Sequence, residues 1–196
     1  MRWKPFCINL SVLTILFVAP LLAASGPPQY NEVPDFALTT QSGKALKRSD
    51  LIGSVWIADF IFTRCQGMCP LLTGHMASLE PRFSDPKFKL VSFSVDPDYD
   101  TPAILTQYAS RYGAKEDKWL FLTGPKTQVW NLITAGFQLG VEEASAEDLA
   151  SGSEPVMHSS RFVLVDREGY IRGYYDSSEP EKMSQLAKDA ATLLQG

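Results

Sequence analysis

The sequence predicts an α/β domain with one central mixed β-sheet flanked by helices. Short apolar runs of strand length alternate with stretches whose apolar residues recur at helical spacing. Two turn signals each join neighbouring strands into a hairpin, so part of the sheet is expected to be antiparallel. The chain has 196 residues, of which 45% are hydrophobic and 11% aromatic. That is enough apolar material for one well-buried core, and we expect one globular domain.

Residues 1–24 differ from the rest of the chain. Arg2 and Lys4 precede an apolar run over residues 6–24 that holds no acidic residue, a pattern typical of an export signal. Spanning a bilayer needs roughly 20 apolar residues, so the segment is either a cleaved signal peptide or a retained N-terminal membrane anchor. We expect an exported protein, periplasmic or anchored to the inner membrane facing the periplasm. The predicted organisation is a signal peptide or anchor (1–24), a linker (25–32) and a domain (33–196).

The charge and cysteine content follow from this division. Without residues 1–24 the formal charge moves from −4 to −6, because that segment holds two basic and no acidic residues. A negative domain argues against nucleic acid as a partner. Cys7 also lies in the segment, which leaves Cys65 and Cys69 in a compartment where disulfides can form.

The first predicted elements lead directly to these cysteines. An N-terminal hairpin is expected from residues 36–39 and 44–47, around the turn Gln41-Ser42-Gly43. Residues 55–63 are a dense apolar run, suited to a central strand that is buried on both faces. A helix is predicted over residues 70–79, since its apolar residues recur at helical spacing.

The later elements continue the alternation. A second buried strand is predicted over residues 89–95. Thr101 as N-cap and Pro102 at the first helical position open a helix that runs to about Tyr112. Residues 142–154 are acidic and without periodicity, so they predict a solvated loop. The remaining expected elements are a strand (119–122), a helix (126–136), a hairpin (161–165 and 170–174) and a terminal amphipathic helix (179–194).

The chemistry-bearing motif is Cys65-Gln66-Gly67-Met68-Cys69-Pro70. Proline is tolerated only in the first helical turn, so Cys69 is expected at the helix N-terminus, where amide dipoles favour thiolate over thiol. In regular helix, Cβ atoms four residues apart are about 5–6 Å from each other, wider than the roughly 3.8 Å of a disulfide. A metal tolerates this spacing better, while Gly67 permits the bend that a bridge requires. We therefore expect a redox-active pair that serves metal binding or disulfide exchange; a short stabilising bridge is the remaining alternative.

Two histidines are present. His75 lies six residues after Cys69, about 9 Å along a helix and roughly 120° away from the cysteine face. It is excluded as a third ligand and predicted to be exposed. His158 precedes the strand 161–165 and is expected in a loop at the mouth of the sheet. Taken alone, it fits an ordinary surface histidine better than a ligand.

These residues belong to a larger pattern. Its parts are Phe60-Ile61-Phe62-Thr63 leading into Cys65-x-x-x-Cys69-Pro70, then Val91-Ser92-Phe93-Ser94-Val95-Asp96-Pro97 with Asp100-Thr101-Pro102, and finally His158 with Phe162-Val163-Leu164-Val165-Asp166. Over about residues 33–195 the pattern resembles the Sco/SenC family, the thioredoxin-fold copper-binding assembly factors of cytochrome c oxidase. The resemblance implies a thioredoxin-like fold to which the N-terminal hairpin is added. It also implies that Cys65, Cys69 and His158 are the copper ligands.

The chemistry of this implied ligand set agrees with copper. Two thiolates and one imidazole suit Cu(I), and N/S sites also bind Cu(II) strongly, although zinc is a competitor for such donors. Met68 and Met157 flank the ligands and are expected to pack rather than to coordinate. Arg64 offers a positive charge to a thiolate of Cys65. Gly67 departs from the family pattern, in which many members carry an acidic residue at this position. The resemblance therefore does not identify the client protein that would receive the copper.

The resemblance implies a copper metallochaperone. Its partner would be a copper-receiving oxidase subunit or another periplasmic cuproprotein, with copper delivered to the CuA site or the cysteines of that site reduced. Two alternatives remain: an exported thiol–disulfide oxidoreductase or thiol peroxidase without a copper role, and an exported structural domain with a closed disulfide. Thioredoxin exchange motifs normally place two residues between their cysteines, whereas this motif has three.

Overall fold

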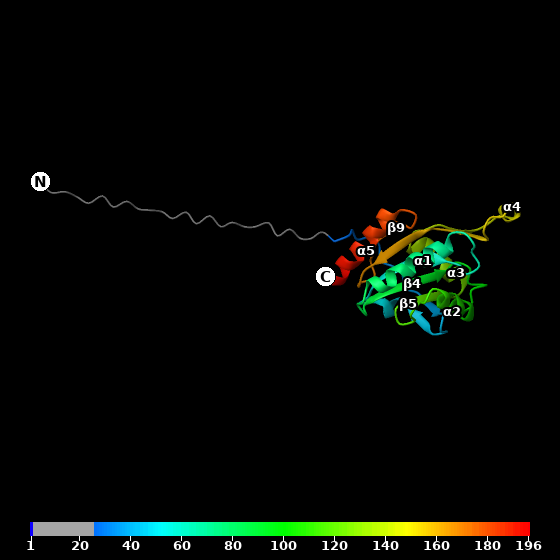
Figure 1. Cartoon of the computed structure of the whole chain (residues 1–196), viewed down its shortest axis with the longest axis horizontal. Coiled ribbons are helices and arrows are strands. Elements are labelled where there is room, and N and C mark those ends of the chain that lie inside the picture. Colours follow the sequence, from blue (N-terminus) through cyan, green and yellow to red (C-terminus); the bar gives the residue numbers. More distant parts are fainter. Residues whose placement is uncertain (2–25) are drawn as a thin grey trace.

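The computed structural model describes Met1 and residues 26–196 (Figure 1). The predicted signal peptide or anchor over residues 1–24, with Cys7, thus lies outside the described residues except for Met1. Among the described residues, no helix combines the length and the apolar character that a membrane crossing requires.

Seven strands form one mixed sheet in the order β2-β1-β5-β4-β3-β8-β9. Their bounds are β1 (Ala37–Thr40), β2 (Ala45–Lys47), β3 (Val55–Ile61), β4 (Phe88–Ser94), β5 (Trp119–Thr123), β8 (Arg161–Val165) and β9 (Ile171–Asp176). The central strands β3, β4 and β5 are parallel. The hairpins β1–β2 and β8–β9 flank them with antiparallel pairing. The predicted mixed sheet and its N-terminal hairpin are confirmed.

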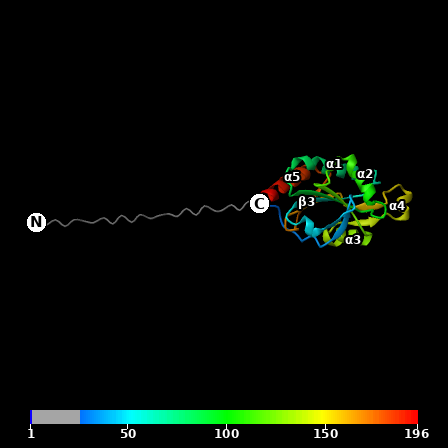
Figure 2. The same ribbon diagram turned by 90° about the horizontal axis from the view of Figure 1, so that it is seen from below.

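Helices cover both faces of this sheet. Helices α1 (Cys69–Leu79), α2 (Pro102–Arg111) and α5 (Pro180–Gln195) lie on one face, and α3 (Lys126–Asn131) lies on the other (Figure 2). The predicted helix over 126–136 continues after α3 as a π-helical turn, η3 (Leu132–Gly136). Two 3-10 turns, η1 (Arg48–Leu51) and η2 (Glu80–Arg82), complete the helical elements of this domain core.

Strand β3 is buried along its whole length, as its apolar run predicted. On the side of η3, Trp56 and Phe60 pack edge-on against Phe137, with ring centroids 6.1 and 5.1 Å apart. Phe93 of β4 joins the same aromatic cluster. Such pairs add to the stabilisation from area burial. Because the cysteine motif follows β3, this cluster fixes the base from which the motif extends.

The starts of α1 and α2 agree with the capping signals. Helix α1 begins at Cys69 with Pro70 in its first turn. At α2, the side chain of Thr101 accepts a hydrogen bond from the backbone N–H of Ile104 at 3.4 Å, and Pro102 is the first helical residue. Gly113 follows this helix with a φ of +69°, a left-handed value that favours glycine.

The segment predicted as a linker is extended, but it is bound to the domain. The backbone N–H of Tyr30 donates to the carbonyl of Ile171 at 2.8 Å, and that of Val33 donates to Gly169 at 2.9 Å. Arg172 also donates to the carbonyl of Pro28 at 3.0 Å. The segment therefore covers the start of the outer edge of β9, which would otherwise expose unpaired backbone groups.

The acidic residues 142–154 are not the unstructured loop that their composition predicted. They include strand β6 (Val141–Glu143) and helix α4 (Ala146–Ala150), and β6 pairs with β7 (Val156–His158) in a separate two-stranded sheet. We call residues 141–158 the β6–β7 hairpin; it projects from the body with α4 at its tip (Figure 1). Ser145 and Asp148 form a reciprocal capping box at α4. The prediction was wrong because elements of three to five residues are too short to show a period.

Candidate metal centre

Cys65 and Cys69 lie between the carboxyl end of β3 and the start of α1 and are not bridged. Their side chains are 8% and 0% exposed. Backbone amides point at both sulfurs: the N–H of Phe62 donates to Cys69 Sγ at 3.5 Å, and the N–H of Cys69 donates to Cys65 Sγ at 3.4 Å. Donors placed in this way stabilise negative charge on sulfur.

The surroundings favour ionisation of Cys65 over ionisation of Cys69. The pKa of Cys65 is lowered to about 6, chiefly because the Cys69 thiol donates a hydrogen bond to it, with backbone N–H groups adding to the effect. The pKa of Cys69 is raised, first by that same donation and second by burial. The expectation that the helix N-terminus would favour a thiolate at Cys69 is therefore wrong, since burial and the shared proton outweigh the helix dipole there.

His158 approaches the cysteine pair from the β6–β7 hairpin. Its Nε2 lies 3.4 Å from Cys69 Sγ, although the two residues are 89 positions apart. Its Nδ1 lies 3.1 Å from the carbonyl oxygen of Ser159. A carbonyl oxygen can only accept, so this contact puts the proton on Nδ1 and leaves the Nε2 lone pair facing the sulfur. Burial lowers the pKa of His158, which favours the neutral ring that a metal ligand requires.

The placement of His158 differs in one respect from the sequence prediction. It is the last residue of β7 and not a loop residue, and its ring packs edge-on against Phe62 with centroids 5.7 Å apart. Strand pairing with Val141 and this aromatic contact hold the ring in place.

The separation between Cys69 and His158 fits a metal ion. A sulfur and an imidazole nitrogen 3.4 Å apart are near enough for one metal ion to be bound by both, since metal bonds to such atoms are about 2.0–2.3 Å long. Within residues 26–196, however, no three Cys, His, Asp or Glu side chains are already arranged as a complete metal cage. Of the three predicted ligands, Cys69 and His158 are thus in contact, whereas their arrangement with Cys65 is not that of a complete cage.

His75 is kept away from this centre, as its helical phase predicted. Its ring packs against Phe162, with centroids 6.4 Å apart, and it lines a hollow together with Leu71, Arg82 and Pro180. It is half-buried rather than exposed, because α5 and β8 pack beside this part of α1. The prediction of an exposed histidine is thus wrong, while its exclusion as a neighbour of the cysteines agrees with the structure.

Three side chains flanking the motif also depart from expectation. Met68 and Met157, predicted to pack, are 42% and 43% exposed. Arg64 does not neutralise Cys65 but donates to Asp96 at 2.6 Å, and its guanidinium lies 4.8 Å from the centre of the Tyr99 ring. The lowered pKa of Cys65 is therefore due chiefly to the hydrogen bonds that it accepts, and not to the neighbouring arginine.

Sequence reasoning missed two buried carboxyl groups near the motif. Asp100 accepts hydrogen bonds from Thr63 N–H at 3.2 Å and from Ser94 Oγ at 2.6 Å. Asp59, in the middle of β3, has no hydrogen-bond partner for either carboxylate oxygen among the described residues. Burial raises its pKa to about 7. An aspartate inside an otherwise apolar run was the available sequence signal for Asp59.

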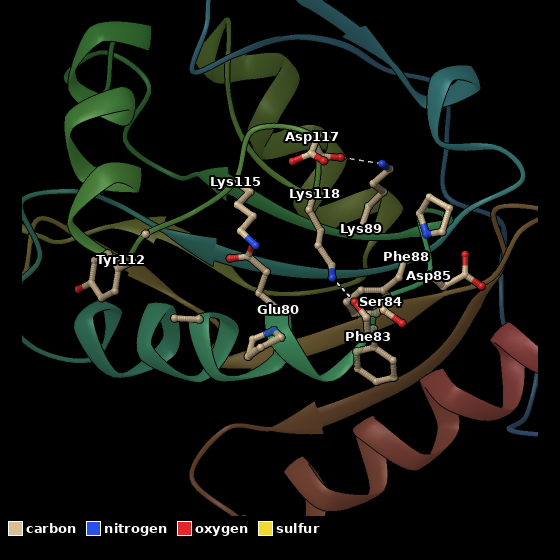
Figure 3. Close-up of a pocket in the computed structure, with 14 residues that line it drawn as sticks. Glu80, Phe83, Ser84, Asp85, Phe88, Lys89, Tyr112, Lys115, Asp117 and Lys118 are labelled. Carbon is tan, nitrogen blue, oxygen red and sulfur yellow. Dashed lines mark hydrogen bonds between the residues drawn. The ribbon is translucent and has the colours of Figure 1, made fainter.

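A large cavity lies at the other end of the sheet. It measures about 730 Å³ and is lined by residues around the amino ends of β4 and β5, among them Glu80, Lys115 and Lys118 (Figure 3). Lys118 donates to the carbonyl of Phe83 across it. None of the cysteine or histidine residues of the sequence prediction lines this cavity, so it is separate from the candidate metal centre.

Comparisons with known proteins agree on one family. The model of the family described as SCO1/SenC matches residues 24–195. A SCO1 protein homolog of Bacillus subtilis is 34% identical over 85% of this chain and 86% of its own length. A protein of Stutzerimonas stutzeri that is named for copper binding is 31% identical over 85% of this chain and 79% of its own length.

Solved structures give the same result. BsSco, described as a member of the Sco family of cytochrome c oxidase assembly proteins with a disulfide switch, is 34% identical. It aligns over 85% of this chain and 96% of its own, with a TM-score of 0.69. The thioredoxin-like fold implied by the resemblance is confirmed.

Proposed function

Because this chain belongs to the SCO1/SenC family, we propose that it is a copper metallochaperone whose cargo is held by Cys65, Cys69 and His158. The observation that carries the proposal is the 3.4 Å approach of His158 Nε2 to Cys69 Sγ. A neutral imidazole lone pair and a sulfur meet there beside a second, ionised sulfur. Soft donors of this kind select copper in preference to Mg²⁺ or Ca²⁺. A relative named for copper binding and a relative named for oxidase assembly support the same function.

The protonation states determine how cargo is taken up. At pH 7 and above, Cys65 is mainly a thiolate and binds without losing a proton, whereas Cys69 must release one. Metal binding at neutral pH therefore releases one proton from the pair. Since His158 is neutral, its Nε2 binds with no further proton released.

The lowered pKa of Cys65 favours a second activity at the same site. A thiolate attacks the disulfide of a client, forming a mixed disulfide and releasing one client thiolate. Cys69 then attacks Cys65, which releases the second client thiol and leaves the Cys65–Cys69 disulfide. The client gains two electrons and this pair loses two, so an external thiol reductant must regenerate it. Reduction of client cysteines and copper delivery are thus compatible uses of one motif.

The proposal extends to the location and the client. We expect an exported protein, periplasmic or anchored through residues 6–24, that serves the CuA-bearing subunit of cytochrome c oxidase or another cuproprotein. Support comes from the export-type pattern of residues 1–24 and from the oxidase-assembly description of BsSco.

Copper titration of four variants tests the proposed ligands. We expect one copper per reduced wild-type chain, no stoichiometric binding by Cys65→Ser or Cys69→Ser, and at least tenfold weaker binding by His158→Ala. His158→Ala should also change the Cu(II) charge-transfer absorption, because one nitrogen donor is lost while both sulfurs remain. His75→Ala is the matched control and should bind as wild type does. Normal binding by His158→Ala with impaired binding by His75→Ala would falsify the assignment.

A further inference from the structure

The β6–β7 hairpin carries His158 but is not part of the main sheet. Its two strands pair only with each other among the described strands, and α4 at its tip projects from the body (Figure 1). The position of His158 relative to the cysteines therefore depends on contacts between this hairpin and the body. One such contact is the ion pair between Glu143 and Lys126, which lies at β6. A further contact lies beside the cysteines.

Glu154 connects the hairpin directly to the cysteine loop. Its Oε1 accepts hydrogen bonds from the backbone N–H of Gln66 at 2.8 Å and of Gly67 at 3.0 Å. A Cβ atom at Gly67 would lie 3.5 Å from the same oxygen, so the carboxylate rests directly against the backbone of the loop. The two donors lie between Cys65 and Cys69, and the acceptor lies four residues before His158. One side chain thereby joins the segments that carry all three proposed ligands.

We propose that Glu154 is a positioning residue that holds the Cys65–Cys69 loop and His158 in the relative position that copper binding requires. This inference rests on the proposed function and assigns a role to a residue outside the ligand set. Hydrogen bonds between an ionised carboxylate and backbone N–H groups are shorter and about twice as strong as neutral ones. Without these hydrogen bonds, the hairpin is no longer attached to the cysteine loop. The distance between His158 and the two cysteines is then less firmly fixed.

The charge of Glu154 has a separate consequence. A carboxylate beside the site stabilises the more positive ion, Cu(II), relative to Cu(I). Removing the charge should therefore raise the Cu(II)/Cu(I) reduction potential, whether or not the hydrogen bonds survive. Position and charge can be separated, because Glu154→Gln keeps an oxygen acceptor but no charge, while Glu154→Ala loses both.

The test compares these two variants with Glu147→Gln, which removes one charge from the same hairpin at α4. We expect Glu154→Ala to bind copper about tenfold more weakly than wild type, within the range seen when residues supporting metal ligands are lost, and to have an altered Cu(II) charge-transfer spectrum. Glu154→Gln should retain the wild-type spectrum with a raised potential. Glu147→Gln should match wild type in affinity and spectrum. Equal copper affinity and spectra for Glu154→Ala and Glu147→Gln would overturn the proposal.

A copper-free measurement separates this inference from the proposed function. In the reduced, metal-free protein, the amide hydrogens of Gln66 and Gly67 should exchange with solvent at least tenfold faster in Glu154→Ala than in wild type or Glu147→Gln. Unchanged exchange at both amides would also overturn the positioning role. If wild type binds no copper, the proposed function fails, and the amide exchange still decides whether Glu154 holds the loop.

Discussion

Cys65 and Cys69 share one loop but differ in charge. Cys69 is enclosed by the end of β3 and by the ring of His158, and its proton is directed at Cys65. Cys65 is the more accessible sulfur, at 8% against 0% exposure, and it receives the backbone N–H of Cys69. The accessible sulfur is therefore also the nucleophilic one, because only a thiolate attacks.

Alkylation of the reduced, copper-free protein tests this difference. The rate of iodoacetamide modification at Cys65 should rise with pH through a midpoint near 6, since its pKa is lowered to about 6. Below that pH the rate should fall about tenfold per pH unit as the thiolate is protonated. In Cys69→Ala the midpoint should move upward, because the thiol that donates to Cys65 is gone. Mass spectrometry locates the label, and first modification at Cys69 would contradict the assignment.

The spacing of the cysteines and the late histidine could be recognised from the sequence, whereas their protonation could not. The charge on Cys65 depends on which sulfur donates to the other, and this is decided by burial that the sequence does not display. The contact of Glu154 with the cysteine loop could not be predicted either, because Glu154 and Gly67 are 87 residues apart in the sequence. Neither a motif nor a period joins such positions.

The turn between β4 and α2 ties together the carboxyl ends of two neighbouring strands. Asp100 is fully buried there and accepts from Ser94, at the end of β4, and from the backbone and hydroxyl of Thr63, just beyond β3. Thr63 lies two residues before Cys65, so Asp100 supports the start of the cysteine loop. Parallel strands bring their carboxyl ends to one edge, where such a cross-link becomes feasible.

Replacing Asp100 by Ala should destabilise the protein by at least about 2 kcal/mol, because it leaves the buried hydroxyl of Ser94 and two half-buried donors of Thr63 without their acceptor. Urea unfolding of the reduced, copper-free protein measures the change. Asp98→Ala is the control, since its side chain is 76% exposed and surface substitutions usually change stability by less than about 0.5 kcal/mol. Equal stability of the two variants would show that the cross-link contributes nothing.

The elements that were predicted correctly have strong local signals. Strand β3 is a continuous apolar run, and α2 has both its N-cap threonine and its proline. The short strand β6 and helix α4 have neither, and their acidic composition suggested a solvated loop. Pairing with β7, a contact between distant residues, stabilises β6, so no local pattern could predict it.

Asp59 couples the stability of the entire fold to pH. It is completely buried in β3, and burial raises its pKa from 3.8 to about 7. Between these two values the unfolded chain has lost the proton that the folded chain retains. Stability contributed by the protonated group is therefore fully present below about pH 4 and is lost as the pH rises towards 7. The interval from 3.8 to about 7 corresponds to about 4 kcal/mol.

Replacing Asp59 by Asn should flatten the pH dependence of unfolding between pH 4 and pH 8, as the amide does not titrate in this range. Unfolding by urea at several pH values, with wild type and variant in parallel, measures the slope. Asp98→Asn, at a position whose side chain is 76% exposed, should retain the wild-type slope. An identical slope for wild type and Asp59→Asn would contradict the raised pKa of this group.

The order of strands was less accessible to sequence reasoning than the strands themselves. The pairing of β8 with β3 joins residues about a hundred positions apart, and local periodicity contains no information about such partners. The resemblance to a known family supplied the thioredoxin-like topology, which the solved structure of BsSco then confirmed.

The bound segment before β1 determines which way the metal centre faces. It contacts residues 169–172, after the end of β8, and Val165 at that end pairs with Trp56 at the start of β3. The cysteines follow the opposite end of β3, seven residues long, or about 20 Å away. The N-terminal segment thus meets the domain near one end of β3, and the cysteine thiols lie at the other end. A domain tethered to a bilayer through residue 26 would direct its cargo outward, to a recipient that stands above the lipid surface.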